Sequence, residues 1–370
     1  MRKIKILTVV GARPQFIKAA ALSRAIKKFN NNSDSIKVEE SIVHTGQHYD
    51  DNMSKIFFDQ LKIPHPEINL EVGSGLHGKQ TGMMLEKLEE VAIDKKPDWM
   101  LIYGDTNSTL AAAIAASKLH IPIAHVEAGL RSFNRKMPEE VNRVVADHLS
   151  RILLCPTDTA VKNLSNEGIT DRVYQIGDVM YDSVLFNFKL AVGGSNIIEQ
   201  LGLVSGQYYL ATIHRAENTD EPQRLQNIIN AFSQIDATIV LPLHPRTKNT
   251  LGVSLKKLAG NVLITAPVAY LDMLMLEKNA SVILTDSGGV QKEAYWASVP
   301  CITLRDETEW IELVDAGVNQ IAGADTAAIL DAVEKVGQVA DRLKSTNTRL
   351  YGDGNTAEKI VEKLVFSSSL

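Results

Sequence analysis

The sequence contains very little cysteine. Cys155 and Cys301 are the only two among 370 residues, and neither belongs to a C-x-x-C pair. This excludes a disulfide-stabilised scaffold and a structural zinc site built from clustered cysteines. His44 and His48 lie close together in the sequence, but two histidines alone do not complete a metal site. We therefore expect no metal, and we expect the reducing cytoplasm as the compartment.

The sequence also lacks a basic excess and long apolar runs. It has 39 Lys and Arg against 44 Asp and Glu, a net charge of −5, so neither nucleic acid nor an anionic membrane is an expected partner. The apolar run of residues 110–116 is far shorter than the roughly 20 residues that span a bilayer. Residues 6–10 are too few for the core of a signal peptide and favour a first strand. We expect no membrane segment.

Short apolar runs alternate with helical patterns along the whole chain, which is typical of α/β proteins with parallel sheets. At roughly 150 residues per domain, the length predicts two domains. The first series of expected strands lies near residues 5–10, 38–44, 99–103, 122–126, 151–154 and 173–176. The second series lies near residues 208–213, 238–243, 261–265, 281–285 and 301–304.

The two series define the expected domains. We expect a first domain at residues 1–190 and a second at 195–350, with a linker at 191–195. In residues 351–370 we expect a last helix that packs back on the first domain. Parallel sheets bind ligands beyond the carboxyl ends of their strands. Two such sheets facing each other therefore predict a site in a cleft between the domains.

The strongest phosphate-binding signal is a strand that runs through Ser287, Gly288 and Gly289 into a helix. A helix start offers free N–H groups and a positive dipole end, and glycines let a diphosphate approach the backbone. Glu293 follows in that helix, where it can accept hydrogen bonds from ribose hydroxyls. The alternative is a simple tight turn with a helix cap. A second glycine pattern, residues 73–78, favours a loop before a helix, so we expect no nicotinamide cofactor.

Acidic residues follow the strands of the first series. Asp105 and Glu127 come directly after the third and fourth strands of the expected sheet, and Glu139 opens a helix after Pro138. Asp105 could instead cap the helix that follows it. Glu139 and Arg143 are four residues apart, so an ion pair on the helix surface is the alternative for them.

A basic residue of the second series also follows a strand. His214 comes after the strand near residues 208–213, where a histidine can donate a proton to a leaving phosphate. A solvated loop charge is the alternative. No G-x-S-x-G elbow, Walker loop or H-E-x-x-H motif occurs, which removes covalent acyl chemistry and nucleotide hydrolysis from consideration.

Taken in order, six motifs resemble the non-hydrolysing UDP-N-acetylglucosamine 2-epimerase family. They are Gly11-x-Arg13-Pro14 with Lys18, Gly104-Asp105-Thr106, His125-Val126-Glu127-Ala128-Gly129-Leu130-Arg131, Pro138-Glu139-Glu140-x-Asn142-Arg143, His214-Arg215, and Leu284-Thr285-Asp286-Ser287-Gly288-Gly289. The resemblance implies two Rossmann-like domains in the GT-B arrangement, a UDP-sugar in the cleft between them, no cofactor, and a homodimer.

The resemblance also implies a reaction. Carbon 2 of a 2-acetamido sugar has no adjacent carbonyl, so its proton is too weakly acidic for simple removal and return. The family instead eliminates UDP to give a 2-acetamidoglycal and then returns UDP and a proton to the other face. Such a reaction needs a base, an acid for the leaving diphosphate, and exclusion of water from the glycal.

Matched position by position, the resemblance assigns roles to particular residues. Asp105, Glu127 and Glu139 are the expected catalytic carboxylates, and His214 assists at the diphosphate. The expected substrate-binding residues are Arg13 and Lys18 at the diphosphate, Arg143 orienting Glu139, Met273 in place of a phenylalanine beside the uracil, and Ser287, Gly288, Gly289 and Glu293 at phosphate and ribose.

One segment bears on the identity of the sugar. Where the family usually has Thr-Glu-Arg-Pro-Glu, this chain has Thr308-Glu309-Trp310-Ile311-Glu312. This form is similar to the branch that converts UDP-2,3-diacetamido-2,3-dideoxyglucuronate to its mannuronate epimer for surface polysaccharides. The alternatives are a UDP-N-acetylglucosamine 2-epimerase and, more distantly, a GT-B glycosyltransferase, because the same nucleotide loop serves any nucleotide sugar.

Overall fold

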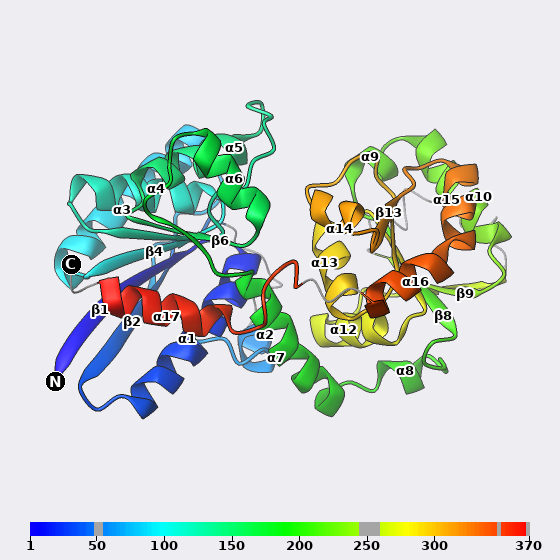
Figure 1. Cartoon of the computed structure of the whole chain (residues 1–370), viewed down its shortest axis with the longest axis horizontal. Helices are drawn as coiled ribbons and strands as arrows, with labels where there is room; N and C mark the ends of the chain where they lie inside the picture. The colour runs from blue at the N-terminus through cyan, green and yellow to red at the C-terminus, as the bar shows by residue number, and fades with distance from the viewer. Residues whose placement is uncertain (48–54, 244–259, 346–348, 368–370) are drawn as a thin grey trace. The chain divides into compact units, whose positions relative to one another are not determined.

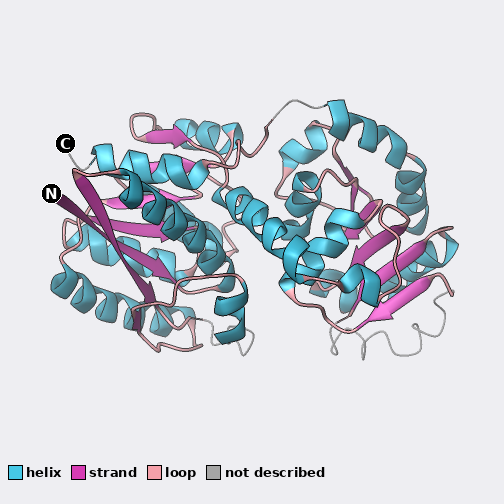
Figure 2. Ribbon diagram, turned by 90° about the horizontal axis from the view of Figure 1, so that it is seen from below, coloured by secondary structure: helices cyan, strands magenta, loops and turns pink. Residues whose placement is uncertain are grey.

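The structure is a computed structural model that describes residues 1–47, 55–243, 260–345 and 349–367. The chain divides into two compact units: unit 1 is Met1–Leu185 with Arg349–Leu370, and unit 2 is Phe186–Thr348. Each unit contains one parallel sheet with helices packed on it (Figures 1 and 2). The predicted α/β class with two parallel sheets is confirmed. In the described parts of the chain, no helix is both long and apolar enough to cross a membrane.

Unit 1 contains a seven-stranded sheet in the order β3-β2-β1-β4-β5-β6-β7, and all neighbouring strands are parallel. The strands are β1 (Arg2–Val10), β2 (Ile36–His44), β3 (Ile68–Asn69), β4 (Trp99–Tyr103), β5 (Ile123–Val126), β6 (Ile152–Cys155) and β7 (Val173–Gln175). The strand order reverses at β1, which lies between β2 and β4. The loops that follow β1, β4 and β5 therefore open side by side, where ligands of such sheets bind.

One helix of unit 1, α4, is rich in small residues and packs directly on the sheet. The first six helices of unit 1 are α1 (Arg13–Asn32), α2 (Lys55–Gln60), α3 (His77–Lys95), α4 (Asn107–Lys118), α5 (Pro138–Leu149) and α6 (Asp158–Asn166). Helix α4 buries five alanines and packs between α3 and α5. Alanine has high helix propensity and little volume, so α4 lies close to the strands while its first turn carries polar residues to their ends.

Unit 2 contains a six-stranded parallel sheet in the order β10-β9-β8-β11-β12-β13. Its strands are β8 (Tyr208–Thr212), β9 (Thr238–Pro242), β10 (Val262–Thr265), β11 (Val282–Thr285), β12 (Cys301–Thr303) and β13 (Asn319–Ile321). Its helices are α8 (Ile197–Gln200), α9 (Ala216–Thr219), α10 (Pro222–Gln234), α12 (Tyr270–Asn279), α13 (Gly288–Trp296), α14 (Ile311–Asp315), α15 (Thr326–Glu334) and α16 (Val336–Ser345). The loops after β8 and β11, which are neighbours, carry His214 and Ser287.

Helix α7 (Val179–Gly194) lies where the sequence predicts a linker. Residues 191–194 form its last turn, and the division between the units falls inside it, after Leu185. Most of the segment predicted as a linker, residues 191–195, is therefore helical. Most side chains of α7 from Val179 to Val192 are apolar. Gly193 and Gly194 lie at its C-terminal end, where glycine is common in helices.

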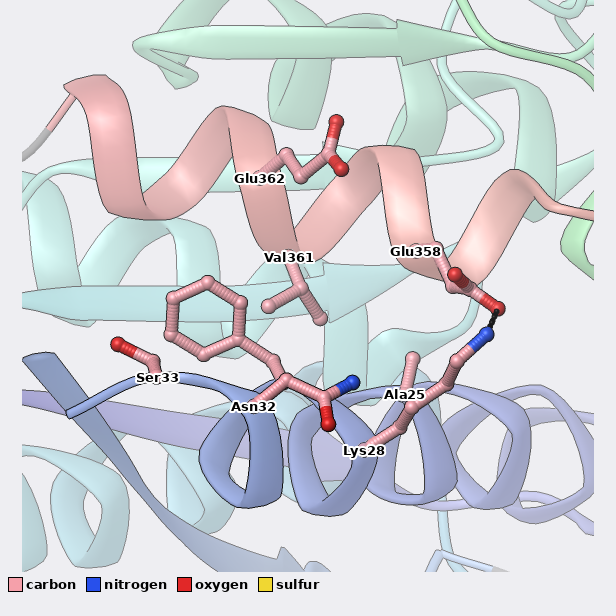
Figure 3. Close-up of a pocket in the computed structure, with 8 residues that line it drawn as sticks. Ala25, Lys28, Asn32, Ser33, Glu358, Val361 and Glu362 are labelled. Atoms are coloured by element: carbon pink, nitrogen blue, oxygen red, sulfur yellow. Dashed lines mark hydrogen bonds and ion pairs between the residues drawn. The ribbon is translucent and has the colours of Figure 1, made fainter.

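Helix α17 (Thr356–Ser367) packs against α1, as the blue and red helices of Figure 1 show. Ile360 and Leu364 are fully buried, and the Asp182 carboxylate accepts the Ala357 N–H at 2.8 Å near the start of the helix. A hollow lies between α1 and α17, and an ion pair of 2.7 Å between Lys28 and Glu358 joins the two helices there (Figure 3). The hollow contains none of the predicted site residues.

Candidate active site

The loops after β1 and β4 approach each other closely at Gly11. A Cβ atom at Gly11 would lie 2.0 Å from Oγ of Ser108 and 2.6 Å from Oγ1 of Thr45, so only glycine fits there. Gln15 ties the same loops together from the first turn of α1. Its side-chain oxygen accepts the Gly11 N–H at 2.7 Å, and its amide donates to the Tyr103 carbonyl at 2.7 Å. Gln15 thus holds the end of β1 against the end of β4.

Glu127 follows β5 in a left-handed conformation, with φ of 71°. This region is unfavourable for a residue with a Cβ atom, and such conformations concentrate at functional sites. The Glu127 carboxylate pairs with Nζ of Lys18, which comes from α1, and both side chains are nearly buried. A Cβ atom at Gly104 would lie 3.5 Å from Oε2 of Glu127, so the loop after β4 passes beside this carboxylate.

Lys18 lies among several carboxylates. Burial by itself lowers its pKa, but the nearby charges of Glu127, Asp178 and Asp105 outweigh burial and raise the pKa above its ordinary value. The ammonium group is therefore firmly charged at neutral pH. A fixed cation at this place suits an anionic ligand group, as the sequence analysis expects for a diphosphate.

Asp105 pairs with Arg143 of α5. The other guanidinium nitrogen, Nη1, donates to Oε2 of Glu140 at 3.2 Å. Burial raises the pKa of Glu140, but hydrogen bonds from Ser132 and Phe133 and the charge of Arg143 bring it below its ordinary value. Arg143 is thus held between two carboxylates. The expected partner of Arg143 was Glu139, and the structure replaces that pairing with Asp105 and Glu140.

Glu139 and Arg13 occupy the first turns of their helices. Glu139 is exposed near the start of α5 and has no hydrogen-bond or ion-pair partner within the described parts of the chain. Glu139 and Glu140 point in different directions because neighbours on a helix do not share a face, and only Glu140 is buried. Arg13 is the first residue of α1, two residues after Gly11, and is partly buried.

A buried histidine supports this site from the core of the sheet. His125 is fully buried on β5; Nδ1 lies 2.7 Å from Oδ1 of Asp147, and Nε2 lies 2.7 Å from the Gly104 carbonyl oxygen. Both neighbours are acceptors, so each ring nitrogen faces an oxygen atom. Asp147 also accepts from Arg131 at 2.7 Å and from the Gly129 N–H at 3.1 Å. This network fixes the loops that carry Asp105 and Glu127.

In unit 2, Ser287 caps α13, and Gly288 and Gly289 form the first turn. The Ser287 hydroxyl accepts the Val290 N–H, and neither glycine carries a side chain over the helix start. Near Gly288, the Trp310 indole N–H donates to the Gly288 carbonyl at 2.8 Å, and the Trp310 ring lies 3.9 Å from Nζ of Lys292. The segment of residues 308–312 therefore contacts the start of α13, where the sequence predicts a phosphate site.

His214 is oriented by Asp286. Nδ1 of His214 lies 3.0 Å from Oδ1 of Asp286, a fully buried carboxylate that also accepts the N–H groups of His214 and Arg215. Burial raises the pKa of Asp286, but these bonds bring it below its ordinary value. His214 is about half exposed, and its Nε2 faces away from Asp286, which is the geometry of a histidine that exchanges a proton. The sequence analysis named Asp286 only within a motif.

Glu293 and Met273 lie on the helices beside this loop. Glu293 is nearly buried on α13 and accepts the Tyr270 hydroxyl at 2.9 Å. Met273 is half-buried on α12 and packs on the core of unit 2. Among the described residues, no group of three or more His, Cys, Asp or Glu side chains is arranged to hold a metal ion. His48 lies outside the described residues.

The chain is similar to known proteins along nearly its whole length. The model of the family described as UDP-N-acetylglucosamine 2-epimerase matches residues 30–365. A protein of Methanococcus maripaludis named UDP-N-acetylglucosamine 2-epimerase homolog is 52% identical over 98% of this chain and 99% of its own length. The UDP-2,3-diacetamido-2,3-dideoxy-D-glucuronate 2-epimerase of Pseudomonas aeruginosa is 48% identical over the same shares.

A solved structure shows the same similarity in three dimensions. The crystal structure of the Methanocaldococcus jannaschii UDP-GlcNAc 2-epimerase in complex with UDP-GlcNAc and UDP has a TM-score of 0.81 and 43% identity. It covers 98% of this chain and 100% of its own chain. Identities of this size over whole chains, together with the family match, leave one conclusion. The chain belongs to the UDP-N-acetylglucosamine 2-epimerase family of isomerases.

Proposed function

We propose that the protein epimerises carbon 2 of a UDP-2-acetamido sugar without hydrolysing it. UDP leaves carbon 1 as the carbon 2 proton is removed, which gives a 2-acetamidoglycal. UDP then returns to carbon 1, and a proton is delivered to the opposite face of carbon 2. The single observation that carries this proposal is the cluster of charged groups at the ends of β1, β4 and β5, where Lys18 pairs with Glu127 and Arg143 pairs with Asp105.

In this proposal unit 1 performs the proton transfers at the sugar. Asp105, Glu127 and Glu139 supply the acid and base groups, and the cations beside the first two hold their carboxylates in fixed positions. Arg13 and Lys18 bind the diphosphate, whose negative charge increases as it leaves carbon 1. Charge-assisted hydrogen bonds of this kind are stronger than neutral ones.

Unit 2 binds the nucleotide in the same proposal. The N-terminus of α13, with Ser287, Gly288 and Gly289, binds phosphate through its free N–H groups. Glu293 accepts the ribose hydroxyls, and the backbone near Met273 binds uracil. His214, oriented by Asp286, donates a proton at the departing diphosphate.

For the sugar, we propose UDP-2,3-diacetamido-2,3-dideoxyglucuronate, converted to its mannuronate epimer for surface polysaccharide synthesis. Two observations support this choice: the 48% identity to the Pseudomonas aeruginosa enzyme, and the contact of Trp310 with the Gly288 carbonyl. Trp310 replaces a family arginine, so the charge and shape beside the nucleotide loop differ from the usual pattern. UDP-N-acetylglucosamine is the second candidate, supported by the Methanococcus maripaludis and Methanocaldococcus jannaschii relatives.

The reaction is tested in deuterated water with no acceptor sugar present. We expect deuterium to enter carbon 2 of the UDP-sugar. Mass spectrometry and proton NMR measure this incorporation. Release of UDP that requires an acceptor, without exchange at carbon 2, would contradict the epimerase and support a glycosyltransferase.

The sugar is tested by measuring kcat/KM for both UDP-sugars on one preparation. A pocket built for a buried carboxylate rejects an analogue that lacks it by orders of magnitude, because its polar partners are left unpaired. We expect the uronate to be preferred by about a hundredfold or more. Equal or faster turnover of UDP-N-acetylglucosamine would overturn the sugar and leave the epimerase intact. Sedimentation of the same preparation tests the homodimer that we propose for the active form.

A further inference from the structure

A buried carboxyl group of unit 2 has no part in the reaction described above. Glu277 on α12 is fully buried, and no N–H or hydroxyl of the described residues donates to either of its oxygens. Its carboxyl group lies beside that of Glu293 on the neighbouring helix α13. Two ionised carboxylates side by side in a buried place repel each other, so one of the two carries a proton.

Within the described parts of the chain, the titratable groups that interact with Glu277 supply no positive charge. They are Glu293 of α13, Tyr270 of its own helix, Tyr208 of β8 and Cys301 of β12. Burial raises the pKa of both tyrosines, and it raises the pKa of the Cys301 thiol to about 12, so all three are neutral at physiological pH. An unpaired carboxylate in such a place is costly, and a carboxyl group there takes up a proton.

The hydrogen bonds indicate which of the two carboxyl groups is protonated. Glu293 is 7% exposed and accepts the Tyr270 hydroxyl at 2.9 Å, which stabilises its charged form. Glu277 receives no donor, and burial followed by the nearby Glu293 raises its pKa well above the ordinary value. The proton therefore resides on Glu277, whose O–H donates to the Glu293 carboxylate.

We propose that Glu277 is a positioning residue of the nucleotide site, whose neutral carboxyl group donates to Glu293 and fixes that carboxylate for the ribose hydroxyls. Tyr270 supplies the second fixed donor. A carboxylate has about four acceptor positions, so it can hold several donors at once. This inference rests on the proposed function, in which Glu293 is the ribose ligand.

The first test compares two replacements of Glu277 by calorimetric titration with UDP. Glu277→Gln keeps a donor, because its amide N–H₂ replaces the carboxyl O–H, and we expect UDP affinity within about twofold of wild type. Glu277→Met keeps the length without a donor, and we expect affinity to fall about tenfold, as for the loss of a hydrogen bond to a charged group. Equal affinity in both variants and wild type would overturn the proposal.

The second test asks whether Glu277 acts through Glu293. We expect Glu293→Gln to weaken UDP binding and Glu277→Met to have no further effect in that background. Additive losses in the double variant would show a general structural effect and overturn the proposal. Unchanged affinity in Glu293→Gln alone would instead remove Glu293 from the ribose site, which is a failure of the proposed function.

The third measurement detects the proton without UDP. We expect the infrared spectrum of the wild-type protein near pH 8 to contain the C=O stretch of a buried carboxylic acid, which Glu277→Gln lacks. Glu293→Gln should keep a band from Glu277, shifted by the changed hydrogen bond. A wild-type spectrum without the band, or a band that survives in Glu277→Gln, would overturn the assignment of the proton.

Discussion

The three candidate carboxylates of unit 1 differ in their surroundings. Glu127 pairs with Lys18 in a nearly buried position, Asp105 pairs with Arg143, and Glu139 is exposed at the start of α5. A group that transfers a proton at a buried carbon must be covered when substrate is bound. For Glu139 we expect the bound substrate to provide that covering.

We predict that Glu127→Gln, Asp105→Asn and Glu139→Gln each lower kcat by about a hundredfold or more while UDP still binds. Each change keeps the shape and removes the proton-transfer group, and such groups contribute factors of this size. Steady-state turnover and calorimetry with UDP measure the two effects separately. Glu358→Gln, at the exposed ion pair with Lys28, is the control and should turn over normally. A variant that stays within about tenfold of wild type is not part of the mechanism.

The buried pairing of His125, Asp147 and Arg131 predicts a pH-dependent stability. Burial raises the pKa of Asp147, but His125 and Arg131 outweigh it, so the pKa in the folded protein lies below the ordinary value. A carboxyl group with a lowered folded pKa stabilises the protein above the unfolded pKa of about 4, and this stabilisation is lost as the pH falls further.

We predict that Asp147→Asn lowers the free energy of unfolding by about 3 to 5 kcal/mol at pH 7, because it removes the buried carboxylate that His125 and Arg131 share. The difference from wild type should shrink as the pH falls below about 4. Urea unfolding at a series of pH values measures it. Asp59→Asn, at a half-exposed carboxylate, is the control and should change the stability little. A difference from wild type that is constant across this pH range would contradict the ionic explanation.

Gly129, in the loop from β5 to α5, has two separate constraints: its backbone conformation and its contact with α6. Gly129 has φ of 81°, and a Cβ atom there would lie 2.4 Å from the Ala160 carbonyl oxygen. Gly168 has nearly the same φ, 79°, but nothing lies within 4 Å of its Cβ position. Alanine substitutions at Gly129 and Gly168 therefore distinguish the cost of backbone strain from the cost of steric overlap.

We predict that Gly168→Ala costs about 1 to 2 kcal/mol of stability, which is the strain of a left-handed alanine. Gly129→Ala should cost about 1 to 3 kcal/mol more, because α6 must also move away from the loop. Chemical unfolding of both variants measures this difference. Equal losses would mean that the loop adjusts without moving α6.

The elements follow the sequence pattern where local signals are strong. The strands predicted near residues 99–103 and 281–285 are the observed β4 and β11 within a residue or so, because the sequence of a buried parallel strand is a continuous apolar run. The short edge strand β3 (Ile68–Asn69) was not predicted, since two residues carry no periodicity. Strand β13 was not predicted either. It has three residues, two of them Asn and Gln, and lies at the edge of the sheet of unit 2.

The site residues show the same limit. Sequence spacing placed Asp105, Glu127 and His214 at strand ends, because parallel strands end at one edge of a sheet. It gave no partner for them. His214 meets Asp286, 72 residues later, and Asp105 meets Arg143, 38 residues later, so only the folded sheet brings each pair together. The feature that marks Asp286 as a partner is a charged side chain at a fully buried position, and only the structure shows that burial.

At the scale of the whole molecule, residues 349–367 complete unit 1 rather than unit 2. We predict that Ile360→Asp, which places a charge in the buried face of α17, destabilises unit 1 by about 3 kcal/mol or more. Hydrogen exchange followed by peptide mass spectrometry should show faster exchange in unit 1 peptides and unchanged exchange in unit 2. Phe366→Asp, on the exposed side of the same helix, should leave both units as in wild type. Equal acceleration in both units would mean that they unfold together.

The position of α17 also sets an order of assembly during synthesis. Unit 2 is one continuous stretch, Phe186–Thr348, whereas unit 1 is made of two stretches that flank it. A ribosome therefore synthesises all of unit 2 before it translates the helix that covers α1 of unit 1. Until then α1 exposes the apolar surface that α17 later buries, so the nascent chain carries a ready binding site for chaperones at its oldest end.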